Sequence, residues 1–311
     1  MTKVGVLGLG IMGSAMSGHL LARKMPVYGF DPIPAQLTTF AAAGGRAADS
    51  VGEVVRQVDL AITSLPTAAA AESVCAEIAA AAPAGFTVIE TSTLPMTVKL
   101  RCRDLLAAAG VVLLDCPLSG TGAQALERDV VVFGSGDEKA FEAVRPVLEG
   151  FSRSVRYLGQ FGHGSTMKYV ANLLVSVHNV ATAEAFALGE RAGLDAQQIY
   201  EAIRDGAGNS VIFEKRGRLM VDRSYLPATA RVTMFIKDIG LISDYAHELN
   251  LPTPMLDATK ELYRRAVDSG LGDYDAAALL GLMSADTLHP HTDEHPPTDE
   301  HPPTDENGSG R

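Results

Sequence analysis

One lysine of the chain lies where it could move a proton. Lys168 stands in an apolar stretch, after Met167 and before Tyr169, Val170 and Ala171. Loss of hydration disfavours an ammonium ion, so a lysine in such surroundings can be neutral near physiological pH and act as a base. Asn172 follows at i+4, on the same helix face, where its amide can hold the lysine or a substrate oxygen. The alternatives are a solvated helix lysine and an asparagine that only packs between helices.

A glycine-rich motif near the N-terminus predicts a dinucleotide site. The motif Gly8-Leu9-Gly10-Ile11-Met12-Gly13 follows an apolar run, Val4–Leu7, and opens a predicted helix. The first glycine allows a tight turn, the second lets a pyrophosphate approach the backbone, and the third lets the helix pack on the strand. The helix N-terminus then offers free N–H groups to the phosphates. The motif alone could be a glycine-rich turn, but the strand before it and the helix after it favour nucleotide binding.

Asp31 predicts that the nucleotide is NAD rather than NADP. It ends the next strand-like run, Val27–Phe30, where an acidic residue takes the ribose hydroxyls of NAD. No Arg or Lys follows in Pro32-Ile33-Pro34 to meet a 2′-phosphate, which the carboxylate would also repel. The alternative is a strand-end Asp that only makes a turn. With a nicotinamide cofactor, hydride leaves a carbinol carbon only as its hydroxyl loses a proton, and this is the task expected of Lys168.

A serine beside a glycine predicts a site for the substrate's charge. Ser119, with the backbone amides of Gly120 and Thr121, could form an anion-binding turn suited to a carboxylate. The alternative is an ordinary loop between a strand and a helix. The expected substrate is therefore a small anionic hydroxy acid.

The elements that must position these residues alternate along residues 1–161. Apolar, strand-like runs are separated by alanine- and leucine-rich stretches, of which Ala68–Ala82 and Pro95–Ala109 are examples. Buried strands joined by helices predict a Rossmann-type, doubly wound parallel sheet in an α/β domain. The runs are Val4–Leu9, Val27–Phe30, Leu60–Leu65, Thr87–Ile89, Val111–Leu114 and Val130–Phe133.

From Gly162 onward the chain predicts an all-α domain, residues 162–287. The stretch Ser165–Arg191 holds no Pro and one Gly, so it is expected to form one long interdomain helix of roughly 40 Å. Ala196–Asp205, Met234–Leu249 and Pro254–Ser269 also have helical patterns. Residues 288–311 contain three HPxTDE units without core-forming residues, which predicts a disordered low-complexity tail. The repeated His and acidic residues could bind metal weakly, although a solvated tail without chemistry is the expectation.

Several motifs in these domains follow the order found in one family. The chain resembles the β-hydroxyacid dehydrogenases, which include 3-hydroxyisobutyrate dehydrogenase and tartronate semialdehyde reductase. The matching segments are Gly8 to Met16 (GLGxMGxxM), Leu65-Pro66-Thr67, Ser92-Thr93, Asp115 to Thr121 (family pattern DxPVSGG), Gly162 to Asn172 (family pattern GxGxxxKxxNN) and Lys237-Asp238-Ile239.

The resemblance implies a role for each matched residue. Lys168, Asn172 and Ser119 would be catalytic, and Ser119, Gly120, Thr121 and Lys237 would bind substrate. The cofactor would be held by the six motif residues and by Asp31, Leu65, Pro66, Thr93 and Lys237. For Lys237, the alternative is a salt bridge to a nearby acid. Two departures, Thr121 for a glycine and Ala171 for an asparagine, lie where substrate is held.

Composition narrows the function classes. A net charge of −11 argues against nucleic acid and against an anionic membrane surface as partners. Three cysteines without a CxxC pair and no metal-ligand cluster fit a reducing cytoplasm, where we expect the protein. The N-terminus leaves no room for a signal peptide, and no apolar run spans a bilayer. The resemblance further implies a homodimer or homotetramer built through the helical domain.

Two other functions remain open. An imine reductase shares the expected architecture, but the family lysine is replaced there, whereas Lys168 is present in this chain. A non-catalytic nucleotide-binding reader domain would be expected to lack that lysine and to carry basic partner-binding segments. The leading prediction is an NAD-dependent dehydrogenase that interconverts a small β-hydroxy acid and its semialdehyde or keto acid.

Overall fold

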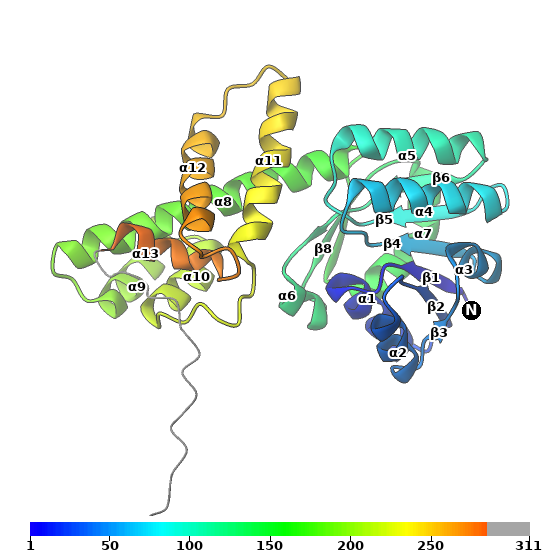
Figure 1. Ribbon diagram of the computed structural model, residues 1–311, viewed down its shortest axis with the longest axis horizontal. Coiled ribbons are helices and arrows are strands. Elements are labelled where there is room, and N and C mark those ends of the chain that lie inside the picture. The colour runs from blue at the N-terminus through cyan, green and yellow to red at the C-terminus, as the bar shows by residue number, and fades with distance from the viewer. Residues whose placement is uncertain (285–311) are drawn as a thin grey trace, which may run out of the picture.

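The computed structural model describes residues 1–284 and has an α/β domain and a helical domain joined by one long helix (Figure 1). The tail predicted to be disordered, 288–311, lies outside the described residues. Among residues 1–284, no helix combines the length and the apolar character needed to cross a membrane. The same residues contain no group of three or more His, Cys, Asp or Glu placed to hold a metal ion.

The predicted Rossmann-type sheet is confirmed. Six parallel strands lie in the order β3-β2-β1-β4-β5-β6. Apart from the short, exposed edge strand β3, they are almost completely buried, which explains the continuous apolar runs. The order reverses between β1 and β4, and ligands of such sheets bind beyond the carboxyl ends of the strands at this point. The strands are β1 (Val4–Leu7), β2 (Val27–Phe30), β3 (Arg46–Ala47), β4 (Leu60–Thr63), β5 (Thr87–Glu90) and β6 (Val112–Asp115).

Helices cover both faces of this sheet, and each face has its own apolar core. On one face α1 packs against α7, and on the other α4 lies between α3 and α5. The alanine-rich sequence of α4 suits this close packing, because small side chains let neighbouring helices approach. The helices are α1 (Ile11–Ala22), α2 (Pro34–Ala42), α3 (Val51–Gln57), α4 (Ala68–Ala81), α5 (Met96–Ala108) and α7 (Glu138–Phe151).

One predicted strand of the main sheet belongs elsewhere, which corrects the sequence-based prediction. The run Val130–Phe133 forms β8 (Val131–Gly134), which lies in a separate sheet between β7 (Leu118–Ser119) and β9 (Ser154–Tyr157). β8 runs antiparallel to β7. The connection between them holds only the short helix α6 (Gly122–Leu126), and a parallel crossover needs about a dozen residues or more.

The long helix predicted after Gly162 is confirmed as α8 (His163–Arg191), which runs from the α/β domain through the helical domain (Figure 1). α10, α11, α12 and α13 all pack on it. The sequence-based prediction did not include α10 or the short C-terminal elements. The remaining elements are α9 (Ala196–Arg204), α10 (Val211–Val221), α11 (Val232–Glu248), α12 (Pro254–Asp268), a 3₁₀ helix (Ala276–Leu279) and α13 (Leu280–Met283).

Candidate active site

The glycine motif forms a loop that fits a pyrophosphate. Gly8 has a φ of +94°, and a Cβ there would lie 2.2 Å from the Ser64 backbone oxygen. A Cβ on Gly13 would lie 1.9 Å from the Gly8 oxygen, so the close approach of α1 to β1 requires this glycine. A Cβ on Gly10 would meet nothing within 4 Å, and no side chain caps α1. The motif therefore presents open space and unpaired N–H groups, as a phosphate requires.

Asp31 lies against this loop. Its Oδ2 accepts a hydrogen bond of 2.8 Å from the Leu9 amide, and its Oδ1 accepts one of 2.9 Å from the Ile33 amide. The carboxylate thus stabilises the turn after β2, which the sequence left open as the alternative to NAD binding. It also bonds to the glycine loop through the Leu9 amide. Each oxygen keeps a lone pair, so these bonds leave acceptor capacity for ribose hydroxyls.

Two further predicted cofactor segments are bonded to each other. The Leu65 amide, in the loop after β4, donates a hydrogen bond of 2.8 Å to the Ser92 Oγ, in the loop after β5. Pro66 is exposed and Thr93 half-buried beside this link. The two loops therefore form one rim at the carboxyl edge of the sheet. Ser92 was recognised in the sequence only as the neighbour of Thr93.

The predicted anion loop is only partly free to bind a ligand. Ser119 is half-buried at the end of β7, and the next residue, Gly120, has a φ of +144° that favours glycine. Thr121 caps α6 in a reciprocal arrangement in which its amide donates to Gln124 Oε1 at 3.1 Å. A substrate anion at the Thr121 amide would have to compete with this bond. The Ser119 hydroxyl and the Gly120 amide have no such partner among the described residues.

Lys168 lies in the second turn of α8 and is 9% exposed. Burial lowers the pKa of Lys168, and the negative charge of Asp238 opposes this shift. Asn172 lies one turn further on, and its Nδ2 donates a hydrogen bond of 2.7 Å to Asp238 Oδ2. Within residues 1–284 no carboxylate lies at ion-pair distance from the Lys168 ammonium. The site therefore holds a desolvated lysine that is influenced by a nearby carboxylate but not locked to it.

Asp238 belongs to α11 and is a site residue that the sequence-based prediction missed. Burial raises the pKa of Asp238, while the charges of Lys168 and Lys237 and the bond from Asn172 oppose the shift. Lys237 itself is exposed, and no described carboxylate pairs with it, so the salt bridge considered as an alternative is absent from this part of the chain. The motif Lys237-Asp238-Ile239 is visible in the sequence, but the family pattern implies a role only for its lysine.

Comparison with known proteins identifies the family. A family model described as the NAD binding domain of 6-phosphogluconate dehydrogenase matches residues 3–159. A second, described as NAD-binding of NADP-dependent 3-hydroxyisobutyrate dehydrogenase, matches residues 162–283. L-threonate dehydrogenase from Haemophilus influenzae is 33% identical over 291 residues, which cover 92% of this chain and 96% of that protein. The chain belongs to the β-hydroxyacid dehydrogenase family.

Solved structures of β-hydroxyacid dehydrogenases share the whole fold. 3-Hydroxyisobutyrate dehydrogenase from Salmonella typhimurium is 32% identical, with a TM-score of 0.80 over 91% of this chain and all of that one. The enzyme from Mycobacterium tuberculosis, solved with L-serine, is 29% identical, with a TM-score of 0.86 over 92% of this chain and all of that one. An imine reductase from Pseudomonas sp., 21% identical with a TM-score of 0.60, shares the fold alone. The protein is an oxidoreductase that acts on a hydroxyl group.

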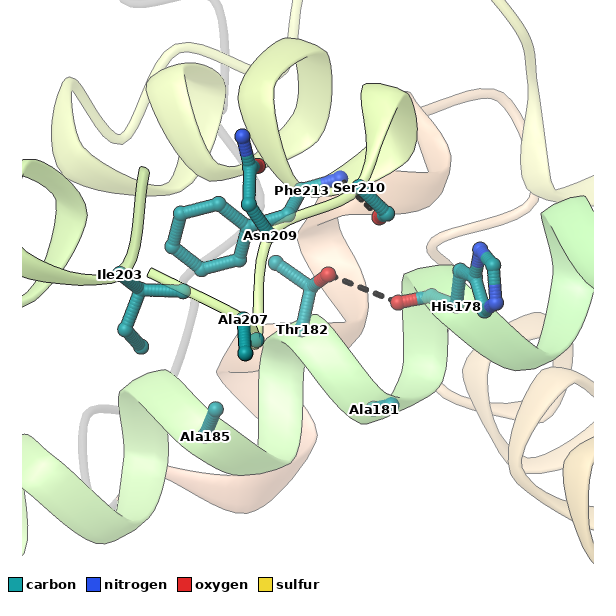
Figure 2. Close-up of a pocket in the computed structure, with 10 residues that line it drawn as sticks. His178, Ala181, Thr182, Ala185, Ile203, Ala207, Asn209, Ser210 and Phe213 are labelled. Atoms are coloured by element: carbon teal, nitrogen blue, oxygen red, sulfur yellow. Dashed lines mark hydrogen bonds between the residues drawn. The ribbon is translucent and has the colours of Figure 1, made fainter. Parts of the chain in front are cut away.

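A cavity of about 420 Å³ in this dehydrogenase lies away from the proposed site, between α8 and the segment that joins α9 to α10 (Figure 2). Two of its polar side chains are hydrogen-bonded within the protein, whereas Asn209 Oδ1 is buried with no partner among the described residues. Thr182 Oγ1 donates to the His178 carbonyl, and Ser210 Oγ accepts from the Phe213 amide. His178 lies ten residues along α8 from Lys168, about 15 Å at 1.5 Å per residue. The cavity is therefore separate from the surroundings of Lys168.

Proposed function

We propose that this enzyme uses NAD to oxidise a small hydroxy acid, with Lys168 as the base that takes the hydroxyl proton. The observation that carries the proposal is a lysine 9% exposed, with a lowered pKa, on the helix that links the two domains. Such a lysine can be neutral at working pH and accept a proton as hydride leaves the same carbon. In the reverse direction it returns the proton to the new alkoxide.

The neighbouring residues have distinct parts in this proposal. Asn172 orients the substrate oxygen or Lys168 and is itself held by Asp238. Ser119 and Gly120 bind the substrate carboxylate, and Lys237 reaches the cofactor or substrate from α11. NAD, when bound, supplies the hydride acceptor. The residues that would hold it are Gly8, Leu9, Gly10, Ile11, Met12, Gly13, Asp31, Leu65, Pro66, Thr93 and Lys237.

The relatives support a substrate with a carboxylate and a nearby hydroxyl. They include enzymes named for L-threonate, 2-(hydroxymethyl)glutarate and 3-hydroxyisobutyrate. We propose that the reacting hydroxyl lies on the β-carbon, one carbon further from the carboxylate than in an α-hydroxy acid. L-Threonate carries hydroxyls on both carbons, so the position of the new carbonyl distinguishes the two geometries.

We also propose a homodimer or homotetramer assembled through the helical domain. Apolar side chains on α8 are exposed in the single chain, with Val170 at 51% and Leu188 at 74%. Exposed apolar area of this kind is typical of a surface that associates. Light scattering on the purified protein should give a mass of two or four chains, and a monomer would contradict the proposal.

The deciding experiment for the function is absorbance at 340 nm with NAD and a panel of hydroxy acids. The panel holds L-threonate, 3-hydroxyisobutyrate and L-serine, each with its neutral amide as the matched control. We expect at least one acid to be oxidised far better than its amide, and carbon-13 spectra of the product to locate the carbonyl on the β-carbon. Reduction of cyclic imines with no activity on any acid would overturn the proposal.

A further inference from the structure

A buried charge network joins the ends of two neighbouring strands, β5 and the edge strand β6. Lys99, on α5, is 1% exposed, and its Nζ lies 2.6 Å from Glu90 Oε2 and 2.7 Å from Asp115 Oδ1. Glu90 ends β5 and Asp115 ends β6. Burial lowers the pKa of Lys99, but the two carboxylates outweigh this and hold it above its usual value. The network therefore buries one lysine between two acidic side chains inside the protein.

The other hydrogen bonds of these carboxylates lead toward the proposed active site. Glu90 Oε1 accepts a hydrogen bond of 2.8 Å from the Ser92 amide. The Ser92 hydroxyl in turn accepts a hydrogen bond from the Leu65 amide, and the two loops that carry these residues form the rim predicted to bind the cofactor, called here the cofactor rim. Asp115 Oδ2 accepts from the Ser165 amide at 2.7 Å, and Asp115 Oδ1 from the Ser165 hydroxyl at 2.8 Å. One side of the network thus touches the predicted NAD loops, and the other touches the start of α8.

The helix α8 depends on Asp115 for its N-terminal cap. Its own N-cap residue is Gly162, which has a φ of +96° and no side chain to accept a hydrogen bond. Asp115, 50 residues away from Ser165 in the sequence, supplies an acceptor for the Ser165 amide and a negative charge at the positive end of the helix, and Ser135 Oγ accepts from the Gly164 amide at 2.9 Å. Lys168 follows Ser165 by three residues, in the next turn of the helix. A second tie holds this turn, because the Tyr169 hydroxyl donates to the Leu94 carbonyl beside Thr93.

Stability alone does not account for this arrangement. Burying three charged groups costs free energy that their attraction often only balances, and an apolar cluster of the same size can be equally stable or more so. What an apolar cluster cannot do is hold defined backbone amides and hydroxyls in place. The partners that the two carboxylates hold are Ser92, in the loop after β5, and Ser165, in the turn of α8 that precedes Lys168.

We propose that Glu90, Lys99 and Asp115 form a positioning network that sets Lys168 against the cofactor rim. Asp115 fixes the first turn of α8, Glu90 fixes the Ser92–Leu65 rim, and Lys99 joins the two carboxylates. The network touches neither substrate nor cofactor and acts through Lys168. The inference rests on the proposed role of Lys168 as the base.

The test is a double-mutant cycle on the full chain, read as kcat and as the Kd for NAD. Asp115→Asn keeps the size of the side chain but weakens the tie to Lys99 and α8. We expect kcat to fall about 10- to 100-fold, because misplacing a catalytic group by about 1 Å has this order of effect. The Kd for NAD, set mainly by the Gly8–Gly13 loop, should stay within about twofold. In a Lys168→Ala background the same change should have almost no further effect, because coupled residues are not additive.

Two further variants keep the test decisive. Ser165→Ala removes a single hydroxyl from the cap and should still fold, and we expect kcat to fall about 10-fold, the lower end of the loss of a charge-assisted bond. Arg101→Met, also on α5, breaks an exposed ion pair with Glu72 and should leave kcat unchanged. Full activity of Asp115→Asn or Ser165→Ala, or losses that add to that of Lys168→Ala, would overturn the positioning role. Full activity of Lys168→Ala itself would instead refute the proposed base.

Discussion

Replacing Lys168 with alanine tests the proposed chemistry directly. The side chain is 9% exposed and makes no ion pair with the described residues, so its removal breaks no structural contact of that kind. The ammonium form is also the one that burial penalises. We therefore expect Lys168→Ala to fold, with a melting temperature close to that of the wild type. The effect should fall on turnover.

The size of the effect follows from the role. A positioned acid or base contributes about 10²- to 10⁴-fold to a rate, which corresponds to about 2.7–5.4 kcal/mol of transition-state stabilisation at about 1.36 kcal/mol per tenfold. The glycine loop that would hold NAD belongs to β1 and α1, whereas Lys168 belongs to α8. The Kd for NAD should therefore change little while kcat falls by at least a hundredfold.

The assay compares kcat by NADH absorbance with the Kd for NAD by fluorescence titration. Lys168→Arg serves as the matched control, because it keeps a positive charge and length but cannot release a proton near neutral pH. We expect Lys168→Arg to be as impaired as Lys168→Ala. A Lys168→Ala enzyme within a few-fold of the wild-type kcat would refute the reasoning, and so would an active Lys168→Arg enzyme.

Three further predictions concern the same site. The negative charge of Asp238 raises the pKa of Lys168, so Asp238→Asn should lower that pKa. The ascending limb of the pH profile of kcat/KM for oxidation should then move to lower pH. A limb that stays in place or moves to higher pH would exclude an electrostatic effect of Asp238 on Lys168. Ser119→Ala should reduce kcat/KM about 10- to 150-fold, from charge-assisted bonds of about 1.5–3 kcal/mol, and should weaken discrimination between an acid and its amide; undiminished discrimination would place the anion elsewhere. Asp31 should make kcat/KM higher with NAD than with NADP, and Asp31→Ser should bring the two kcat/KM values closer together. Equal kcat/KM with NAD and NADP in the wild type would show that the Asp31 carboxylate does not face the ribose.

Much of the site was predictable because its residues fall in groups that are close together in the sequence. The backbone of the glycine motif is dictated by sterics at Gly8 and Gly13, and the spacing of Lys168 and Asn172 places them one turn apart on any helix. The long helix followed from a stretch without proline. Residues within one turn or one short loop need no knowledge of the rest of the chain.

The contacts that tune the site come from packing. Asp238 reaches Asn172 from 66 residues away, and Asp115 reaches Ser165 from 50 residues away. Neither pairing has a periodicity that a sequence would reveal, because each depends on how one helix docks on another element. Asp115 was visible as part of a motif, but its function as the cap of α8 appears only when β6 and α8 are placed together.

The sequence by itself determined the Rossmann-type sheet, the continuous α8 and the types of residue that can carry hydride and proton chemistry. Periodicity, glycine sterics and burial of apolar runs act within short segments, so they can be read along the chain. Tertiary structure decided that β8 leaves the main sheet, that the Thr121 amide is taken by Gln124, and that Lys168 lies near Asp238. These features depend on which distant groups compete for the same hydrogen bonds and space, and only the folded chain resolves that competition.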